Sequence, residues 1–163
     1  MVKIFYEVNK EIPSKLLFVG DGPERTTAEQ LCRELNICND VQFVGKQEQM
    51  EDILAIADLF LLTSEYESFG LAALEAMAAE VPVVSTNAGG LPEIMIEGVT
   101  GFMADIGDVE TMSKQAISIL SDDKRLQQFK KDAGKHAHTF DIKNIIPLYE
   151  KLYNEVLSKE LVH

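Results

Sequence analysis

The sequence has little cysteine and no long hydrophobic run. Its two cysteines, Cys32 and Cys38, form no CxxC pair and belong to no Cys/His cluster with metal-binding spacing. We therefore expect free thiols in a reducing compartment, no metal and no other cofactor. No signal peptide opens the sequence, and no apolar run approaches the roughly 20 residues that span a membrane. These absences predict a cytoplasmic protein without a transmembrane segment.

Basic residues are also scarce. Lys and Arg total 15 against 27 Asp and Glu, so the net charge is -12, and no Lys/Arg run is present. Because nucleic-acid binding depends on rows of cations that neutralise phosphates, this charge pattern excludes nucleic acid as an expected partner. A single small anion can still be held where a helix end and one or two cations converge, since the local field outweighs the net charge.

Strand-like apolar runs alternate with helical patterns over the first two thirds of the chain. This alternation predicts an α/β fold with a Rossmann-like, doubly wound parallel sheet. From Asp108 onward only helices are expected, and Tyr149 and Tyr153 of the last helix are expected to pack. The length of 163 residues predicts a single domain, 1–163. The expected strands are KLLFVG (15–20), VQFVG (41–45), DLFLLTS (58–64), VPVVST (81–86) and TGFMAD (100–105).

The loops that follow the strands are the places to look for a ligand, because open parallel sheets bind ligands beyond the carboxyl ends of their strands. In the first such loop, GDGP, Gly20 and Gly22 allow close approach of a ligand to the backbone. A plain strand-to-helix turn remains the alternative for this loop. The loop is not a GxGxxG motif, which disfavours a dinucleotide oxidoreductase.

Two glutamates, Glu67 and Glu75, flank a Phe-Gly step that resembles the start of a helix. On one helix they would lie roughly 12 Å apart along the axis, farther than the roughly 5 to 9.5 Å between paired glycosidase carboxylates. With Glu67 in the preceding loop and Glu75 in the second turn, the amides of Phe69, Gly70 and Leu71 would hold a phosphate between two hydroxyl-binding carboxylates. That arrangement fits a nucleotide sugar. The alternative is that Glu67 caps the helix and Glu75 is a solvated surface residue.

Several segments together resemble one family. ESFGLAALE is similar to the E-x7-E motif of the retaining glycosyltransferases of the two-lobed GT-B type, the glycogen-synthase-like and sucrose-synthase-like family. GDGP, VQFVGK, EAMAAEVPVVSTNAGGLPE and GVTGFMADIGD occur in that family's order, so the resemblance covers nearly all of residues 15–110. It implies one lobe of a GT-B fold, the C-terminal lobe that binds the donor. The acceptor lobe and the first strand of the donor lobe are absent from this sequence.

The resemblance also implies roles for particular residues. By position, Glu75 binds the ribose hydroxyls, and Glu67 binds hydroxyls of the transferred sugar near C3 and is the candidate catalytic residue. Both act by binding more than by proton transfer. The other donor-binding residues that the resemblance implies are Ser68, Phe69, Gly70 and Leu71 at the diphosphate and sugar, Val44, Gly45 and Lys46 at the base, and Gly20 and Gly22 beside the diphosphate.

The family's Arg and Lys that neutralise the leaving diphosphate lie upstream and are missing here, with Lys46 and Arg25 the nearest substitutes.

Within the family, STNAGGLPE and GKQEQMEDILAIADLFLLTSEYESFG are most similar to the branch that joins N-acetylglucosamine to L-malate. The resemblance therefore implies transfer of N-acetylglucosamine from a UDP-sugar to a small acceptor such as L-malate, with this chain alone inactive. The alternative is a stand-alone nucleotide-binding or regulatory module without catalysis.

Overall fold

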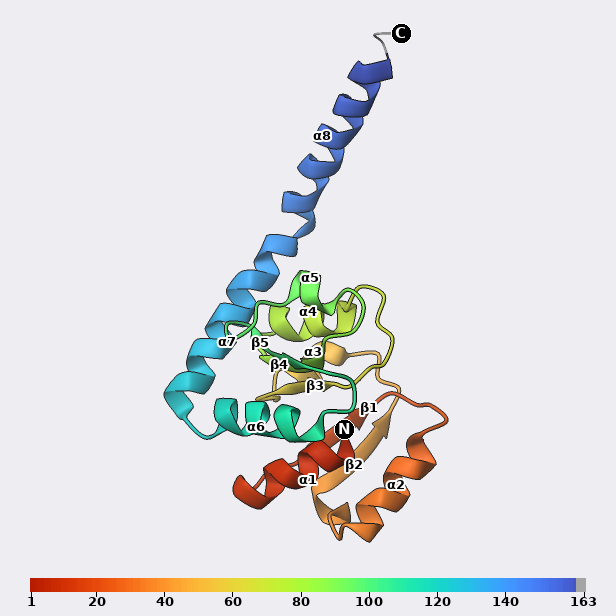
Figure 1. Cartoon of the computed structure of the whole chain (residues 1–163), viewed down its shortest axis with the longest axis vertical. Coiled ribbons are helices and arrows are strands. Elements are labelled where there is room, and N and C mark those ends of the chain that lie inside the picture. Colours follow the sequence, from red (N-terminus) through yellow and green to blue (C-terminus); the bar gives the residue numbers. More distant parts are fainter. Residues whose placement is uncertain (161–163) are drawn as a thin grey trace.

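Strands and helices alternate through most of the computed structural model, which describes residues 1–160 (Figure 1). The strands are β1 (Leu16–Val19), β2 (Val41–Gly45), β3 (Phe60–Leu62), β4 (Val83–Thr86) and β5 (Gly101–Ala104). The α-helices are α1 (Val2–Glu11), α2 (Arg25–Glu34), α3 (Met50–Leu54), α4 (Leu71–Ala78), α5 (Leu91–Ile94), α6 (Val109–Leu120), α7 (Asp123–Ala137) and α8 (Ile142–Glu160). Two short 3-10 turns, η1 (Cys38–Asp40) and η2 (His138–Phe140), complete the set.

The strands are parallel wherever they pair, as the sequence predicts, but the hydrogen-bonded ladder has two parts. β1 pairs with β2, and β3, β4 and β5 pair in that order. The predicted Rossmann-like architecture with helices on both faces is confirmed.

Strand β4 is the most deeply buried strand, and it separates two layers of helices. All four of its residues are buried. Val83 packs into a cluster with α3, α4 and α5, while Val84 packs on the opposite face into a cluster with α1 and α6. Neighbouring side chains of a strand point to opposite faces, so a strand covered by helices on both sides needs an uninterrupted apolar run. VPVVST supplies such a run.

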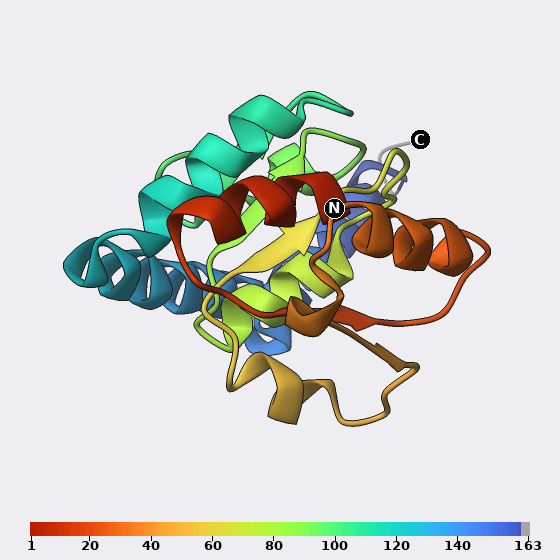
Figure 2. The ribbon, with the colours of Figure 1, turned by 90° about the horizontal axis from the view of Figure 1, so that it is seen from below.

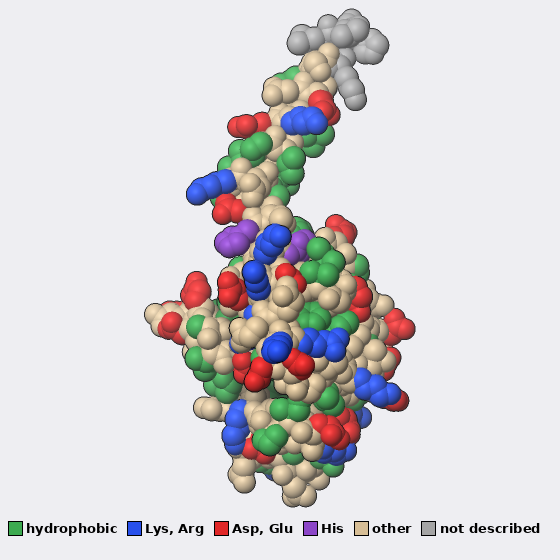
Figure 3. All heavy atoms as spheres, turned by 90° about the vertical axis from the view of Figure 1, so that its left-hand side faces the viewer, with side chains coloured by type: hydrophobic (Ala, Val, Ile, Leu, Met, Phe, Trp, Pro, Cys, Tyr) green, Lys and Arg blue, Asp and Glu red, His purple; other side chains and the backbone are tan. Residues whose placement is uncertain are grey.

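Helix α8 leaves the globular part and projects away from it (Figure 1). Its apolar side chains stay on the surface, and hydrophobic atoms are visible along the projecting helix in Figure 3. Tyr149 is 56% exposed and Tyr153 is 62% exposed. The prediction that these tyrosines pack is therefore wrong for the described chain, because no described element lies opposite this part of α8.

Candidate functional site

The start of α4 has the layout that the sequence predicts. Glu67 lies in the loop after β3, and Glu75 lies in the second turn of α4. Gly70 precedes the helix with a φ of +92°, a left-handed conformation that favours glycine. The helix itself is rich in alanine, and Ala73, Ala76 and Met77 pack against the sheet. The placement of the two glutamates is confirmed, whereas their roles remain predictions.

Glu67 is half-buried and already has one partner. Its Oε1 accepts a hydrogen bond from the Gly70 N–H at 3.1 Å, so this carboxylate takes up one of the predicted anion-binding amides. The amides of Ser68, Phe69 and Leu71 donate no hydrogen bond within residues 1–160. These three amides are therefore free to donate hydrogen bonds to a ligand. The Glu67–Gly70 hydrogen bond is the contact expected if Glu67 caps the helix.

Glu75 is exposed on the outer side of α4. Its carboxylate has no hydrogen bond or ion pair within the described part of the chain. A solvated carboxylate next to a helix start is available to accept hydrogen bonds from ligand hydroxyl groups. The same geometry also suits the alternative of a plain surface residue.

The loop after β4 supports the Glu67 loop through direct backbone contact. The Gly90 N–H donates to the Glu67 carbonyl oxygen at 3.2 Å, and the Thr86 hydroxyl donates to the Ser64 carbonyl oxygen at 2.6 Å. A Cβ at Gly89 would lie 1.6 Å from the Glu67 carbonyl oxygen, so only glycine fits there. This Gly-Gly pair is not among the residues predicted for the site, although the doublet in TNAGGLPE is a visible signal.

Helix α7 supports the start of α4 through α5. A Cβ at Gly70 would lie 2.7 Å from Ile94 Cδ1, so α5 packs directly on the start of α4. The carbonyl oxygen of Ile94 in turn accepts a hydrogen bond from His136 Nε2 at 2.9 Å. His136 also lies edge-on against Phe140, with ring centroids 5.4 Å apart. The chain of contacts from α7 to Gly70 holds the candidate site in place.

The loops after β1 and β2 form a second part of the candidate site. The Gly20 N–H donates to the Gly45 carbonyl oxygen at 2.8 Å, which ties the two loops together. Asp21, Gly22 and Lys46 line an open hollow of about 350 Å³. Figures 1 and 2 place the loops after β1 and β3 on the same side of the molecule. The loops that carry the predicted residues therefore lie on the same side of the molecule.

The two candidate cations differ in availability. Arg25 Nε lies 2.9 Å from Glu29 Oε1, and an Arg25 Nη lies 3.9 Å from Asp21 Oδ1. Lys46 is exposed and makes no ion pair within residues 1–160. Lys46 is consequently the better placed of the two to meet a phosphate.

The backbone near the predicted base site is partly engaged. Val44 and Gly45 are half-buried, and the Val44 carbonyl oxygen accepts a hydrogen bond from Gln47 Nε2 at 2.6 Å. Beneath them, the rings of Phe18 and Phe43 stack with centroids 4.7 Å apart. The stacked rings support this loop.

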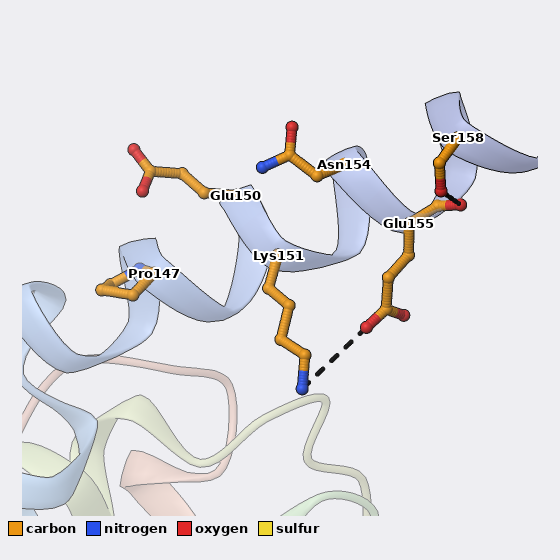
Figure 4. Close-up of a pocket in the computed structure, with 6 residues that line it drawn as sticks. All are labelled: Pro147, Glu150, Lys151, Asn154, Glu155 and Ser158. Atoms are coloured by element: carbon orange, nitrogen blue, oxygen red, sulfur yellow. Dashed lines mark hydrogen bonds and ion pairs between the residues drawn. The ribbon is translucent and has the colours of Figure 1, made fainter.

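A larger hollow, of about 500 Å³, lies along α8 and away from these loops (Figure 4). Its lining residues, which include Lys151 and Glu155 at 3.9 Å, all come from this one helix. Because one helix supplies only one wall, we do not place the site there.

Residues 1–160 contain no group of three or more His, Cys, Asp or Glu side chains arranged to hold a metal. Within the same range, no helix is long and apolar enough to cross a membrane.

Comparison with known proteins decides the family. The model of the family described as "Glycosyl transferases group 1" matches residues 1–136. The chain is a group 1 glycosyltransferase domain. This membership does not favour the alternative of a stand-alone module without catalysis.

Relatives of this glycosyltransferase domain include two N-acetylglucosamine enzymes. N-acetyl-alpha-D-glucosaminyl L-malate synthase of Bacillus anthracis is 41% identical over 161 residues, which are 98% of this chain and 42% of that protein. The 2-deoxystreptamine N-acetyl-D-glucosaminyltransferase of Niallia circulans is 32% identical over 165 residues, with 96% and 41% coverage. The glycosyltransferase domain thus spans about two fifths of the length of these curated relatives.

Solved structures establish the fold of the domain. Anabaena Alr3699/HepE in complex with UDP and glucose matches with a TM-score of 0.81 at 23% identity, over 96% of this chain and 44% of that one. The pneumococcal O-GlcNAc transferase GtfA in complex with UDP and GlcNAc matches with a TM-score of 0.83 at 21% identity, over 96% and 32%. The fold is that of one lobe of a GT-B glycosyltransferase, as the sequence predicts.

Proposed function

We propose that this domain is the donor-binding, C-terminal lobe of a retaining glycosyltransferase that transfers N-acetylglucosamine from a UDP-sugar to a small acceptor such as L-malate. The observation that carries the proposal is the pair of carboxylates at the start of α4, with Glu67 in the loop and Glu75 in the helix. The 41% identity to the malate synthase supports the choice of sugar and acceptor. The acceptor would bind to a second lobe.

Glu67 suits contact with the transferred sugar. The Gly70 amide holds its Oε1, while Oε2 forms no hydrogen bond within the described residues. An oriented carboxylate with one free oxygen can accept hydrogen bonds from sugar hydroxyls without a further loss of side-chain freedom. Such contacts contribute to catalysis when they become stronger in the transition state.

The diphosphate would lie between the two carboxylates. The unpaired amides of Ser68, Phe69 and Leu71 and the dipole of α4 favour negative charge there. Lys46, exposed on the loop after β2 beside Asp21 and Gly22, would supply a positive charge. In the transfer step, the acceptor oxygen bonds to the anomeric carbon as the bond from that carbon to the diphosphate oxygen breaks, and UDP leaves with the proton of the acceptor hydroxyl on a phosphate oxygen.

Calorimetric titration tests these assignments on the chain itself. Glu75→Ala should weaken UDP binding by about 1 to 3 kcal/mol, because hydrogen bonds between the ribose and a charged group are lost. Glu67→Gln should weaken UDP-N-acetylglucosamine more than UDP, because its partner is on the sugar. Glu150→Ala, which removes the same charge from the exposed part of α8, is the matched control and should bind both ligands like the wild type. Equal UDP affinity in the wild type and Glu75→Ala would rule out the ribose assignment.

A further inference from the structure

Helix α5 lies directly against the loop after β3 and next to α4 (Figure 1). A Cβ added at Gly90, just before α5, would lie 2.7 Å from the Ser68 carbonyl oxygen. A Cβ added at Gly70 would lie 2.8 Å from Leu91 Cδ2 and 2.7 Å from Ile94 Cδ1. Because these distances are shorter than an ordinary contact, no space separates α5 from the loop. A displacement of α5 must therefore displace the loop as well.

Helix α5 is too short to hold this position by its own hydrogen bonds. It has four residues, and the Met95 N–H donates to the Leu91 carbonyl oxygen at 3.0 Å. A single helical turn is not stable alone. Burial of Leu91 and Ile94 in the core keeps α5 on the domain, but apolar contacts are not directional. A hydrogen bond, which is directional, therefore has a large influence on how α5 lies against the loop.

His136 of α7 supplies such a hydrogen bond. Its Nε2 lies 2.9 Å from the carbonyl oxygen of Ile94, the last residue of α5. Because a carbonyl oxygen only accepts, Nε2 carries the hydrogen and donates it. The Ile94 carbonyl oxygen accepts no other hydrogen bond within residues 1–160. Without His136, this buried residue would keep an acceptor that has no partner.

The ring of His136 is itself held in place. It lies edge-on against Phe140, and α7 is tied to the loop before β3 by the ion pair between Lys130 Nζ and Asp58 Oδ1 at 2.7 Å. His136 also lies in the last turn of α7, where a cation is favoured by the helix dipole. The alternative role for His136 is therefore to stabilise α7 and nothing else.

The two carboxylates of the candidate site depend on α5 to different degrees. The Gly90 N–H donates to the Glu67 carbonyl oxygen, and the Gly70 N–H donates to Glu67 Oε1. The backbone and the side chain of Glu67 are thus both tied to residues that border α5. Glu75 lies on the exposed side of α4 and makes no hydrogen bond within the described residues. A displaced α5 would disturb Glu67 more than Glu75.

We propose that His136 is a positioning residue for the sugar half of the donor. His136 does not contact the ligand. It holds the Ile94 carbonyl, and α5 in turn keeps Glu67 where the transferred sugar needs it. This role rests on the proposed function, in which Glu67 binds the sugar and Glu75 binds the ribose. Loss of the His136 hydrogen bond should therefore weaken the binding of UDP-N-acetylglucosamine and leave the binding of UDP unchanged.

Calorimetric titration with both ligands tests this selectivity. His136→Leu removes the donor and should weaken UDP-N-acetylglucosamine at least about fivefold, but UDP less than about twofold. His136→Gln provides an amide donor and should recover about half of that loss. Lys130→Met is the matched control, because it removes a polar contact of α7 that does not involve α5. This control should keep the wild-type ratio of the two affinities.

Amide hydrogen exchange by NMR gives a second measurement, which needs no ligand. The Gly90 amide donates to Glu67, whereas the Val83 amide donates to the Thr100 carbonyl oxygen at 3.1 Å in the buried sheet. His136→Leu should accelerate exchange at Gly90 at least about tenfold more than at Val83. Equal acceleration of the two amides would mean that His136 only stabilises the fold, and this result would overturn the proposal.

Glu67→Gln in the same titrations separates the role of His136 from the proposed function. If Glu67→Gln changes the ratio of the two affinities and His136→Leu does not, the role of His136 is wrong and the proposed function stands. If Glu67→Gln itself leaves the ratio unchanged, Glu67 does not bind the sugar, and the positioning role falls with that assignment.

Discussion

Single residues in this domain act mainly through the backbone that they permit. The contact of Gly89 with the Glu67 carbonyl oxygen fixes the distance between the loops after β3 and β4. At Gly70, the absence of a side chain makes room for Ile94. At this scale the candidate site depends on the lack of a side chain at Gly70 and Gly89 as much as on the two carboxylates.

Replacing Gly89 should therefore cost stability beyond the cost of its left-handed φ. Gly107→Ala is the matched control, because Gly107 has a φ of +84° and an added Cβ would meet nothing within 4 Å. Gly107→Ala should cost about 1 to 2 kcal/mol, and Gly89→Ala should cost at least about 2 kcal/mol more, since the Cβ and the Glu67 oxygen overlap. Urea denaturation measures both losses. Equal losses would show that the two loops separate without strain.

At the scale of elements, the helices of the C-terminal half have their own start signals. Asp108 accepts a hydrogen bond from the Thr111 N–H at 2.9 Å, and Asp122 accepts one from the Arg125 N–H at 3.0 Å. Carboxylates at these positions satisfy backbone donors that have no partner in the helix. The starts of α6 and α7 are thus encoded locally.

The cap of α6 predicts a pH dependence. The hydrogen bond from the Thr111 backbone N–H, followed by one from its side chain, holds the pKa of Asp108 below its ordinary value. Because the folded pKa is the lower one, the stabilisation is complete above the unfolded pKa of about 3.9 and is lost as pH falls through the folded pKa. Asp108→Asn should therefore show a smaller fall in Tm between about pH 5 and pH 2 than the wild type.

Thermal melts followed by circular dichroism measure this difference. Asp123→Asn is the control, because it removes the same charge from the first turn of α7, and the Asp123 side chain makes no hydrogen bond in the described chain. A fall in Tm for Asp108→Asn equal to that of the wild type would mean that the cap does not titrate in this range.

At the scale of the whole molecule, the proposed function needs a second lobe. The candidate residues lie on loops at one end of the sheet, while α8 projects with its apolar side chains exposed. Alignment of donor and acceptor can lower a barrier by roughly 7 to 11 kcal/mol, and the proposed arrangement assigns the acceptor to the other lobe. Binding of a donor and transfer of its sugar should therefore be separable properties.

We expect this chain alone to transfer no sugar from UDP-N-acetylglucosamine to L-malate. Joined to the remaining part of the Bacillus anthracis relative, it should become active, and Glu67→Gln in that chimera should lower turnover more than UDP affinity. Mass spectrometry of the products compares the isolated chain, the chimera and its Glu67→Gln variant. Transfer by the isolated chain would contradict the two-lobe proposal, and an unaffected Glu67→Gln chimera would remove Glu67 from the site.

Features that depend on neighbouring residues can be predicted from the sequence alone. Continuous apolar runs are long enough to specify buried parallel strands, so β4 and the helices around it were predicted. The eight-residue spacing of Glu67 and Glu75 across a Phe-Gly step was enough to place one in a loop and the other in a helix. Each of these inferences uses a period or a spacing within one short segment.

Features that join distant segments become visible only in the folded chain. Gly89 meets Glu67 and His136 meets Ile94, although neither pairing has a periodic signature. The apolar pattern of α8 predicted a packed face, but a pattern specifies only that a face is apolar and not what covers it.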